Sequence, residues 1–189
     1  MKNKILVTGT GRAGTSLLMA IFTKMELDTG FKESDIARFN NDKACCGLED
    51  FNRNAYIIKR PIPDNMPTEM FVTKHKYDLI IIPIRKLKHS SDSRIRIHEM
   101  GLSSGSLTHN GKPSNQYNNN AIFLGELVSE IIMRDIPYLF IKFPEFVYNF
   151  DYFWNTIAGC EQLTKLKFTK EIAQKAWCES VKPGKVHIK

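Results

Sequence analysis

The first 25 residues constrain the fold most, because they join an apolar run, a glycine-rich loop and a helical pattern. The run Ile5-Leu6-Val7 ends just before Gly9, which is typical of a strand buried on both faces of a parallel sheet. The next apolar residues follow the spacing of one helix face: Leu17, Leu18, Ile21, Phe22 and Met25. The chain is therefore predicted to open as strand, glycine loop and helix.

The rest of the chain continues this alternation. Three further apolar runs predict strands at residues 55–58, 78–84 and 138–143, and the second of these runs is rich in β-branched residues. Helices are predicted from a cap at Ser90 or Ser91 through Met100, and over 121–134, 146–157 and 170–179. The alternation predicts one α/β domain over residues 1–189, a three-layer sandwich with a central parallel sheet.

Residues 103–120 are dominated by Ser, Gly, Asn and Pro, the composition of a mobile loop. A connection of about 18 residues is longer than most loops in compact domains. We therefore expect this segment to be either disordered or a functional lid.

Composition excludes several classes of protein. No apolar run approaches the roughly 20 residues of a membrane span, and the N-terminal run is shorter than the about 7 residues of a signal peptide core. We expect a cytoplasmic protein.

Four cysteines without a CxxC pair, and scattered histidines, argue against a zinc site or a disulfide framework. The net charge of +7 favours polyanionic partners, but the basic runs are not interleaved with aromatic residues, which argues against nucleic acid.

The glycine loop reads Gly9-Thr10-Gly11-Arg12-Ala13-Gly14-Thr15-Ser16. Such a loop turns successive N–H groups into one concavity, and the helix N-terminus adds partial positive charge. We expect a phosphate-like group to bind at its second half: Gly11, Arg12, Ala13, Gly14, Thr15 and Ser16. The spacing Gly-x4-Gly-x-Ser is that of a nucleotide P-loop, so the predicted sandwich is P-loop-NTPase-like.

Two positions depart from an ATPase. Thr15 stands where the P-loop lysine is expected, and a basic residue, Arg12, stands earlier in the loop. ATPases usually hold Mg²⁺ with an Asp at the end of an apolar strand, whereas here the third strand is followed by Arg85. The sequence therefore predicts an anion site that works without a metal.

A second basic element follows the third strand. Arg85 is expected at the carboxyl edge of the sheet, where open α/β sheets bind ligands, and Ser93 follows eight residues later on the next helix. An arginine fork and a serine hydroxyl can together hold a phosphate. Two separate anion sites at one edge predict a ligand with two separated phosphates.

With these motifs the chain resembles the sulfotransferases that use 3'-phosphoadenosine 5'-phosphosulfate (PAPS), in particular bacterial members. The family's 5'-phosphosulfate loop matches Arg12-Ala13-Gly14-Thr15-Ser16, and its 3'-phosphate motif matches Arg85 and Ser93. The lysine that many members carry near a proline, at the end of the second strand, matches Lys59. The resemblance covers most of the chain in order and spacing.

The resemblance implies transfer of a sulfuryl group from PAPS, without a metal, to a hydroxyl or amine of a carbohydrate or small metabolite. The loop would hold the phosphosulfate. Arg12 and Lys59 would stabilise charge on the bridging oxygen, and Arg85 with Ser93 would hold the 3'-phosphate and select PAPS over ATP.

The general base is less clearly indicated. Cytosolic members of the family often carry a histidine two residues after the lysine, but Pro61 stands there, so the base is expected to be a carboxylate or to be absent. Glu33 is the first candidate and Glu49 the second. His98 and His109 are remoter candidates.

Two other functions remain open at this stage. One is a P-loop kinase of nucleotides or small molecules, which would need Mg²⁺ and a loop lysine. The other is a non-catalytic protein that binds polyanions through a basic face. The acceptor also stays open between a sugar hydroxyl, a lipid headgroup and a small metabolite, as does the oligomeric state.

Overall fold

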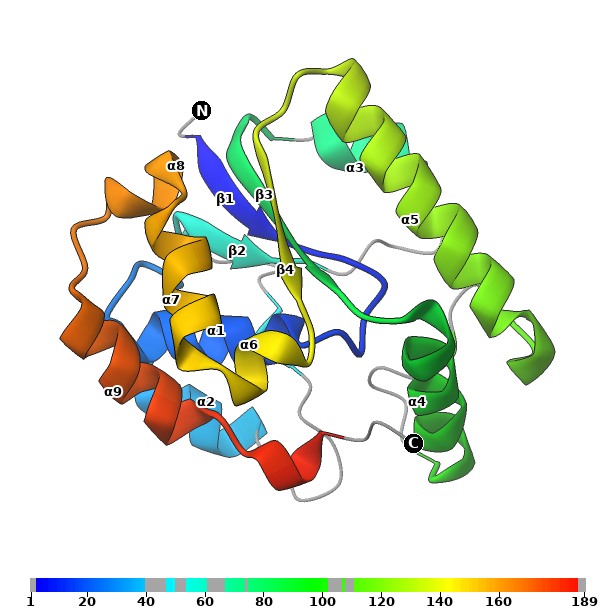
Figure 1. Ribbon diagram of the computed structural model, residues 1–189. Coiled ribbons are helices and arrows are strands. Elements are labelled where there is room, and N and C mark those ends of the chain that lie inside the picture. Colours follow the sequence, from blue (N-terminus) through cyan, green and yellow to red (C-terminus); the bar gives the residue numbers. More distant parts are fainter. Residues whose placement is uncertain are drawn as a thin grey trace.

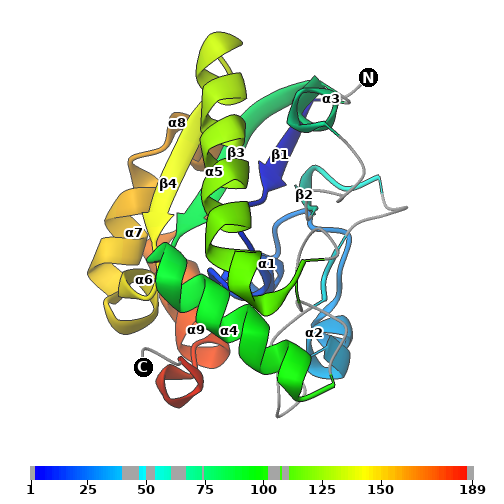
Figure 2. The same cartoon turned by 90° about the vertical axis from the view of Figure 1, so that its right-hand side faces the viewer.

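A computed structural model describes residues 3–39, 47–49, 54–60, 67–73, 75–101, 107 and 111–186. Its sheet has four strands, β1 (Lys4–Val7), β2 (Ile57–Lys59), β3 (Tyr77–Ile84) and β4 (Tyr138–Lys142). All pairs are parallel, and the strand order is β2-β1-β3-β4. Helices cover both faces of this sheet (Figures 1 and 2). The predicted α/β sandwich with a central parallel sheet is confirmed.

Successive side chains of a strand point to opposite faces of the sheet, and each face is covered by its own set of helices. Leu79 and Ile81 of β3 pack on the face of α1, while Ile80 and Ile82 pack on the face of α5. The first face also holds α6, α7 and α9, and the second holds α3. The bounds are α1 (Thr15–Lys24), α2 (Glu33–Phe39), α3 (Thr68–Thr73), α4 (Leu87–Glu99), α5 (Gln116–Met133), α6 (Glu145–Tyr148), α7 (Phe150–Ala158), α8 (Glu161–Thr164), α9 (Lys170–Ser180), and the 3₁₀ turns η1 (Pro113–Asn115) and η2 (Pro183–Lys185).

Strand order brings two predicted motifs to one place. The strands β1 and β3 are neighbours, but β1 leads into α1 on one face, and β3 leads through α4 into α5 on the other. Connections that leave adjacent strands in opposite directions create the crevice where open α/β sheets bind ligands. The glycine loop follows β1 and Arg85 follows β3, so both lie at this crevice.

The end of the predicted loop 103–120 is helical. Residues 113–115 form η1, and α5 begins at Gln116. Gln116 and Asn120 are fully buried, and Asn120 Nδ2 donates to Ser91 Oγ of α4 at 2.9 Å. At Gln116 and Asn120, polar residues that suggested a loop are instead buried at the start of α5. Residues 102–106 and 108–110 of this segment lie outside the described residues.

Other boundaries also differ from the sequence prediction. Helix α4 begins at Leu87, so Ser90 and Ser91 lie inside it and donate back to the Leu87 carbonyl instead of capping the helix. The predicted helix 146–157 is two helices, because Asn149 ends α6 and its side chain caps α7 by accepting from the Tyr152 N–H at 2.9 Å. The short helices α2, α3 and α8 were not predicted, since four to seven residues carry little periodicity.

Within the described ranges, no helix combines the length and apolar character that a membrane span requires.

Helix α5 provides a test of the packing. Leu127 is 0% exposed in the core beneath α5, whereas Ile122 on the same helix is 60% exposed. We expect Leu127→Ala to lower the free energy of unfolding by about 2–5 kcal/mol, because it leaves a cavity. The matched control Ile122→Ala should change it by less than about 0.5 kcal/mol. Urea denaturation measures both, and equal losses would contradict the placement of α5.

Candidate functional site

The glycine loop has a backbone that only glycine accommodates at two positions. Gly11 has a φ of 68°, and a Cβ there would collide with the guanidinium of Arg94. Gly14 has a φ of 91°, and a Cβ there would lie 2.7 Å from Cδ2 of Phe143. Gly14 is the N-cap of α1, which has neither a side-chain cap nor an acidic residue in its first turn among the described residues. The first amide groups of α1 could therefore bind an external acceptor such as an anion.

Arg94 of α4 holds the glycine loop by hydrogen bonds to its backbone. Its Nε and Nη2 atoms donate to the Thr10 carbonyl at 3.0 and 2.6 Å, and the residue is only 9% exposed. This bidentate contact explains why Gly11 cannot carry a side chain. Sequence analysis missed the role of Arg94, because a loop carbonyl as its partner leaves no motif in the sequence.

Three predicted binding residues come together beside the loop. Arg85 Nη1 donates to the Arg12 carbonyl at 2.8 Å, and Arg12 Nε donates to Ser93 Oγ at 3.2 Å. Arg85 and Ser93 are both buried. The loop and the Arg85–Ser93 pair, predicted as separate elements, are thus contiguous through Arg12.

The charges of this group affect one another. The pKa of Arg85 is lowered to about 10, mainly by burial and also by the nearby guanidinium groups of Arg12 and Arg96, while Asp92 opposes these effects. The Arg85 guanidinium also lies 5.2 Å from the centre of the Phe143 ring, a cation–π contact that favours its charged form. A bound anion would relieve the repulsion between these cations.

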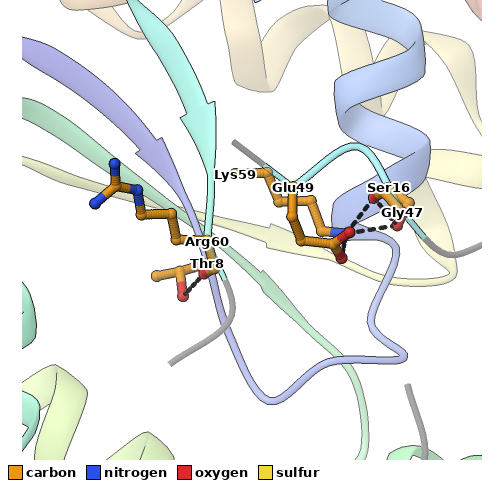
Figure 3. A network of polar contacts seen from close by, with 6 residues as sticks. All are labelled: Thr8, Ser16, Gly47, Glu49, Lys59 and Arg60. Atoms are coloured by element: carbon orange, nitrogen blue, oxygen red, sulfur yellow. Dashed lines mark hydrogen bonds and ion pairs between the residues drawn. The ribbon is translucent and has the colours of Figure 1, made fainter. Parts of the chain in front are cut away.

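A second group lies on the side of β2. Lys59, at the end of β2, is buried, and its Nζ donates to Ser16 Oγ at 2.8 Å, to the Gly47 carbonyl at 2.6 Å and to Glu49 Oε1 at 2.5 Å. Figure 3 shows Lys59 directed toward the first turn of α1, whereas its neighbour Arg60 points away. Because β1 lies between β2 and β3, Lys59 and Arg85 reach the loop from opposite sides.

The structure separates the two candidate bases. Glu49 contacts Lys59 at the site. Glu33 is 68% exposed and lies 3.4 Å from Lys24, in the last turn of α1. The ten residues of α1 span about 15 Å, which places Glu33 at the end of the helix away from the loop. His98 is exposed near the end of α4, and His109 and Pro61 lie outside the described residues.

Comparison with known proteins finds no protein-family model that matches this chain, and no curated protein matches it either.

The loop geometry can be tested at Gly11. We expect Gly11→Ala to lower the free energy of unfolding by at least about 1 kcal/mol, because its backbone is left-handed and Arg94 occupies the added volume. Gly125 lies inside α5 with open space around its Cα. The control Gly125→Ala should therefore raise stability by up to about 1 kcal/mol. Urea denaturation followed by tryptophan fluorescence compares the two variants. An unchanged free energy of unfolding in Gly11→Ala would contradict the close contact between Arg94 and the loop.

Proposed function

We propose that the carboxyl edge of the sheet binds PAPS and that the protein transfers its sulfuryl group to an acceptor hydroxyl. The main support is the bond from Arg85 to the Arg12 carbonyl, which joins the glycine loop to the residues that match the family's 3'-phosphate motif. Lys59 adds a cation at the first turn of α1, where the reacting group would lie.

The peptide geometry favours two bound anions over one. The C=O and N–H groups of a trans peptide unit point in opposite directions. Since Arg85 binds the Arg12 carbonyl, the N–H of Ala13 is directed away from the Arg85 guanidinium. The loop amides and Arg85 therefore serve different anions, as expected for a ligand with phosphates at its 5' and 3' positions. Arg12 lies between the two and can contact both.

In the proposed transfer step, the acceptor reacts directly with the sulfuryl group of PAPS beside Lys59 and Arg12. The acceptor oxygen attacks sulfur in line, and the bond from sulfur to the bridging oxygen breaks. Its electron pair stays on the 5'-phosphate, which leaves as adenosine 3',5'-bisphosphate. Lys59 and Arg12 stabilise the charge that develops on the bridging oxygen.

Glu49 is the group placed to take the proton of the acceptor hydroxyl. It now accepts from Lys59 Nζ. When Lys59 turns to the donor, the Glu49 carboxylate loses that partner and can accept the proton of the acceptor. This assignment replaces Glu33, which lies at the other end of α1.

Donor binding is tested by thermal unfolding. A ligand at 100 times its Kd stabilises the folded state by about 2.7 kcal/mol, which raises the Tm of a chain of this size by roughly 5–10 °C. We expect adenosine 3',5'-bisphosphate to give such a shift, and Arg85→Gln to remove it. Lys175→Gln, which removes an exposed charge on α9, should keep it.

Other outcomes separate the alternative functions. Stabilisation by ATP with Mg²⁺, but not by the bisphosphate, would favour a kinase. Stabilisation by polyanions alone, strongly weakened by salt, would favour a non-catalytic binding protein. Either result would overturn the proposed donor.

The catalytic roles are tested by the release of adenosine 3',5'-bisphosphate from PAPS, with a panel of sugar and small-metabolite hydroxyls as acceptors. Lys59→Met should lower kcat by about 10²–10³-fold and leave affinity for the bisphosphate within about threefold, because its contribution arises mainly in the transition state. Glu49→Gln should lower kcat by about 10²-fold or more. Glu33→Gln should retain activity, and loss in Glu33→Gln with retention in Glu49→Gln would return the base to Glu33.

A further inference from the structure

Helix α4 carries a third arginine, Arg96, beside the Arg12–Arg85–Ser93 group. Arg96 lies three residues after Ser93, so the two side chains share one face of α4. Its guanidinium is near enough to Arg85 to act on the pKa of that residue. The guanidinium groups of Arg12 and Arg96 thus both lie near Arg85, and that of Arg12 donates to the Ser93 hydroxyl.

The donor groups of Arg96 are incompletely used. Its Nε is shielded from solvent, yet has no hydrogen-bond partner among the described residues. A charged N–H that is buried without an acceptor is costly. Such a group in native structures calls for an explanation, and an absent ion or ligand is one of the common ones.

The local charge also favours an anion. In the described part of the chain, the acidic residue that supports the charge on Arg85 is Asp92. The Asp92 carboxylate is itself 2.9 Å from Lys88 Nζ, so its charge is shared with a further cation. The Asp92 carboxylate therefore serves both Arg85 and Lys88.

We propose that Arg96 is a binding residue of the distal anion subsite, and that with Arg12, Arg85 and Ser93 it selects a dianionic phosphate monoester over a monoanionic ester. A phosphate monoester carries a charge of about −1.5 to −2 at pH 7 and three acceptor oxygens, which match three guanidinium forks and a hydroxyl. A phosphodiester carries one charge and leaves part of this donor set unused. The identification of the monoester with a 3'-phosphate of adenosine rests on the proposed function.

The experiment compares four ligands by isothermal titration: adenosine 3',5'-bisphosphate, adenosine 3'-phosphate, adenosine 5'-phosphate and adenosine 2',3'-cyclic phosphate. The wild-type protein should bind the 3'-phosphate at least about tenfold more tightly than the cyclic diester. Arg96→Gln should weaken binding of the bisphosphate and the 3'-phosphate by about 10–100-fold, and should leave the 5'-phosphate within about twofold.

Two variants serve as controls for charge and folding. Lys175→Gln removes one exposed positive charge from α9 and should leave all affinities unchanged. Arg96→Lys keeps the charge and should recover a large part of the affinity that Arg96→Gln loses. Each variant is first checked for an unchanged unfolding transition without ligand. If Arg96→Gln does not fold, the comparison of Arg96→Lys with wild type decides, because Lys lacks the planar fork and should still weaken the 3'-phosphate selectively.

The outcomes separate this inference from the proposed function. Equal binding of the bisphosphate by wild type and by both Arg96 variants would overturn the role of Arg96 and leave the donor assignment intact. Stabilisation by inorganic phosphate that depends on Arg96, without binding of any adenosine phosphate, would support the subsite and overturn the donor. Wild-type protein that binds neither adenosine phosphates nor inorganic phosphate would overturn both. Equal affinity of wild type for the 3'-phosphate and the cyclic diester would overturn the dianion preference.

Discussion

The site depends on two arginines that bind the carbonyl groups of the glycine loop. Arg94 binds the Thr10 carbonyl, and Arg85 binds the Arg12 carbonyl. Glycine-rich loops lose much conformational entropy when they are ordered, and these charge-assisted bonds offset that cost. They also fix which side of the loop each peptide N–H faces. One set of contacts therefore holds the loop and orients its donors.

The same arrangement places like charges side by side in a partly buried setting. The lowered pKa of Arg85 reflects this cost, first through burial and then through Arg12 and Arg96. A protein that keeps such a group stores electrostatic free energy that a bound anion can release. On the proposed function, binding of an anion at this edge of the sheet would therefore also stabilise the fold.

The fold was predictable because apolar residues carry its pattern. The strands β1 and β3 are continuous apolar runs, and their parallel pairing follows from the helices between them. The start of α5 was not predictable in this way. Gln116 and Asn120 are polar residues buried against α4, and a polar residue gives the same sequence pattern in a loop and in a buried contact between helices.

The site shows the same division. Motif spacing indicated Arg12 in the glycine loop, and Arg85 and Ser93 after the third strand, while the family resemblance indicated Lys59. The choice between Glu33 and Glu49 needed the fold, because distance along the chain does not show which end of α1 a carboxylate will reach. The roles of Arg94 and Arg96 could not be predicted, because they depend on which face of α4 packs against the glycine loop. Tertiary packing determines that face.

The ion pair between Lys59 and Glu49 also bears on the order of events. The charges of Lys59 and Glu49 compensate each other while the two groups are in contact. On the proposed mechanism a negatively charged donor competes for Lys59 and thereby frees the carboxylate that an acceptor needs. This arrangement favours an ordered kinetic mechanism in which the nucleotide enters first and leaves last, and it limits wasteful hydrolysis of PAPS before an acceptor has arrived.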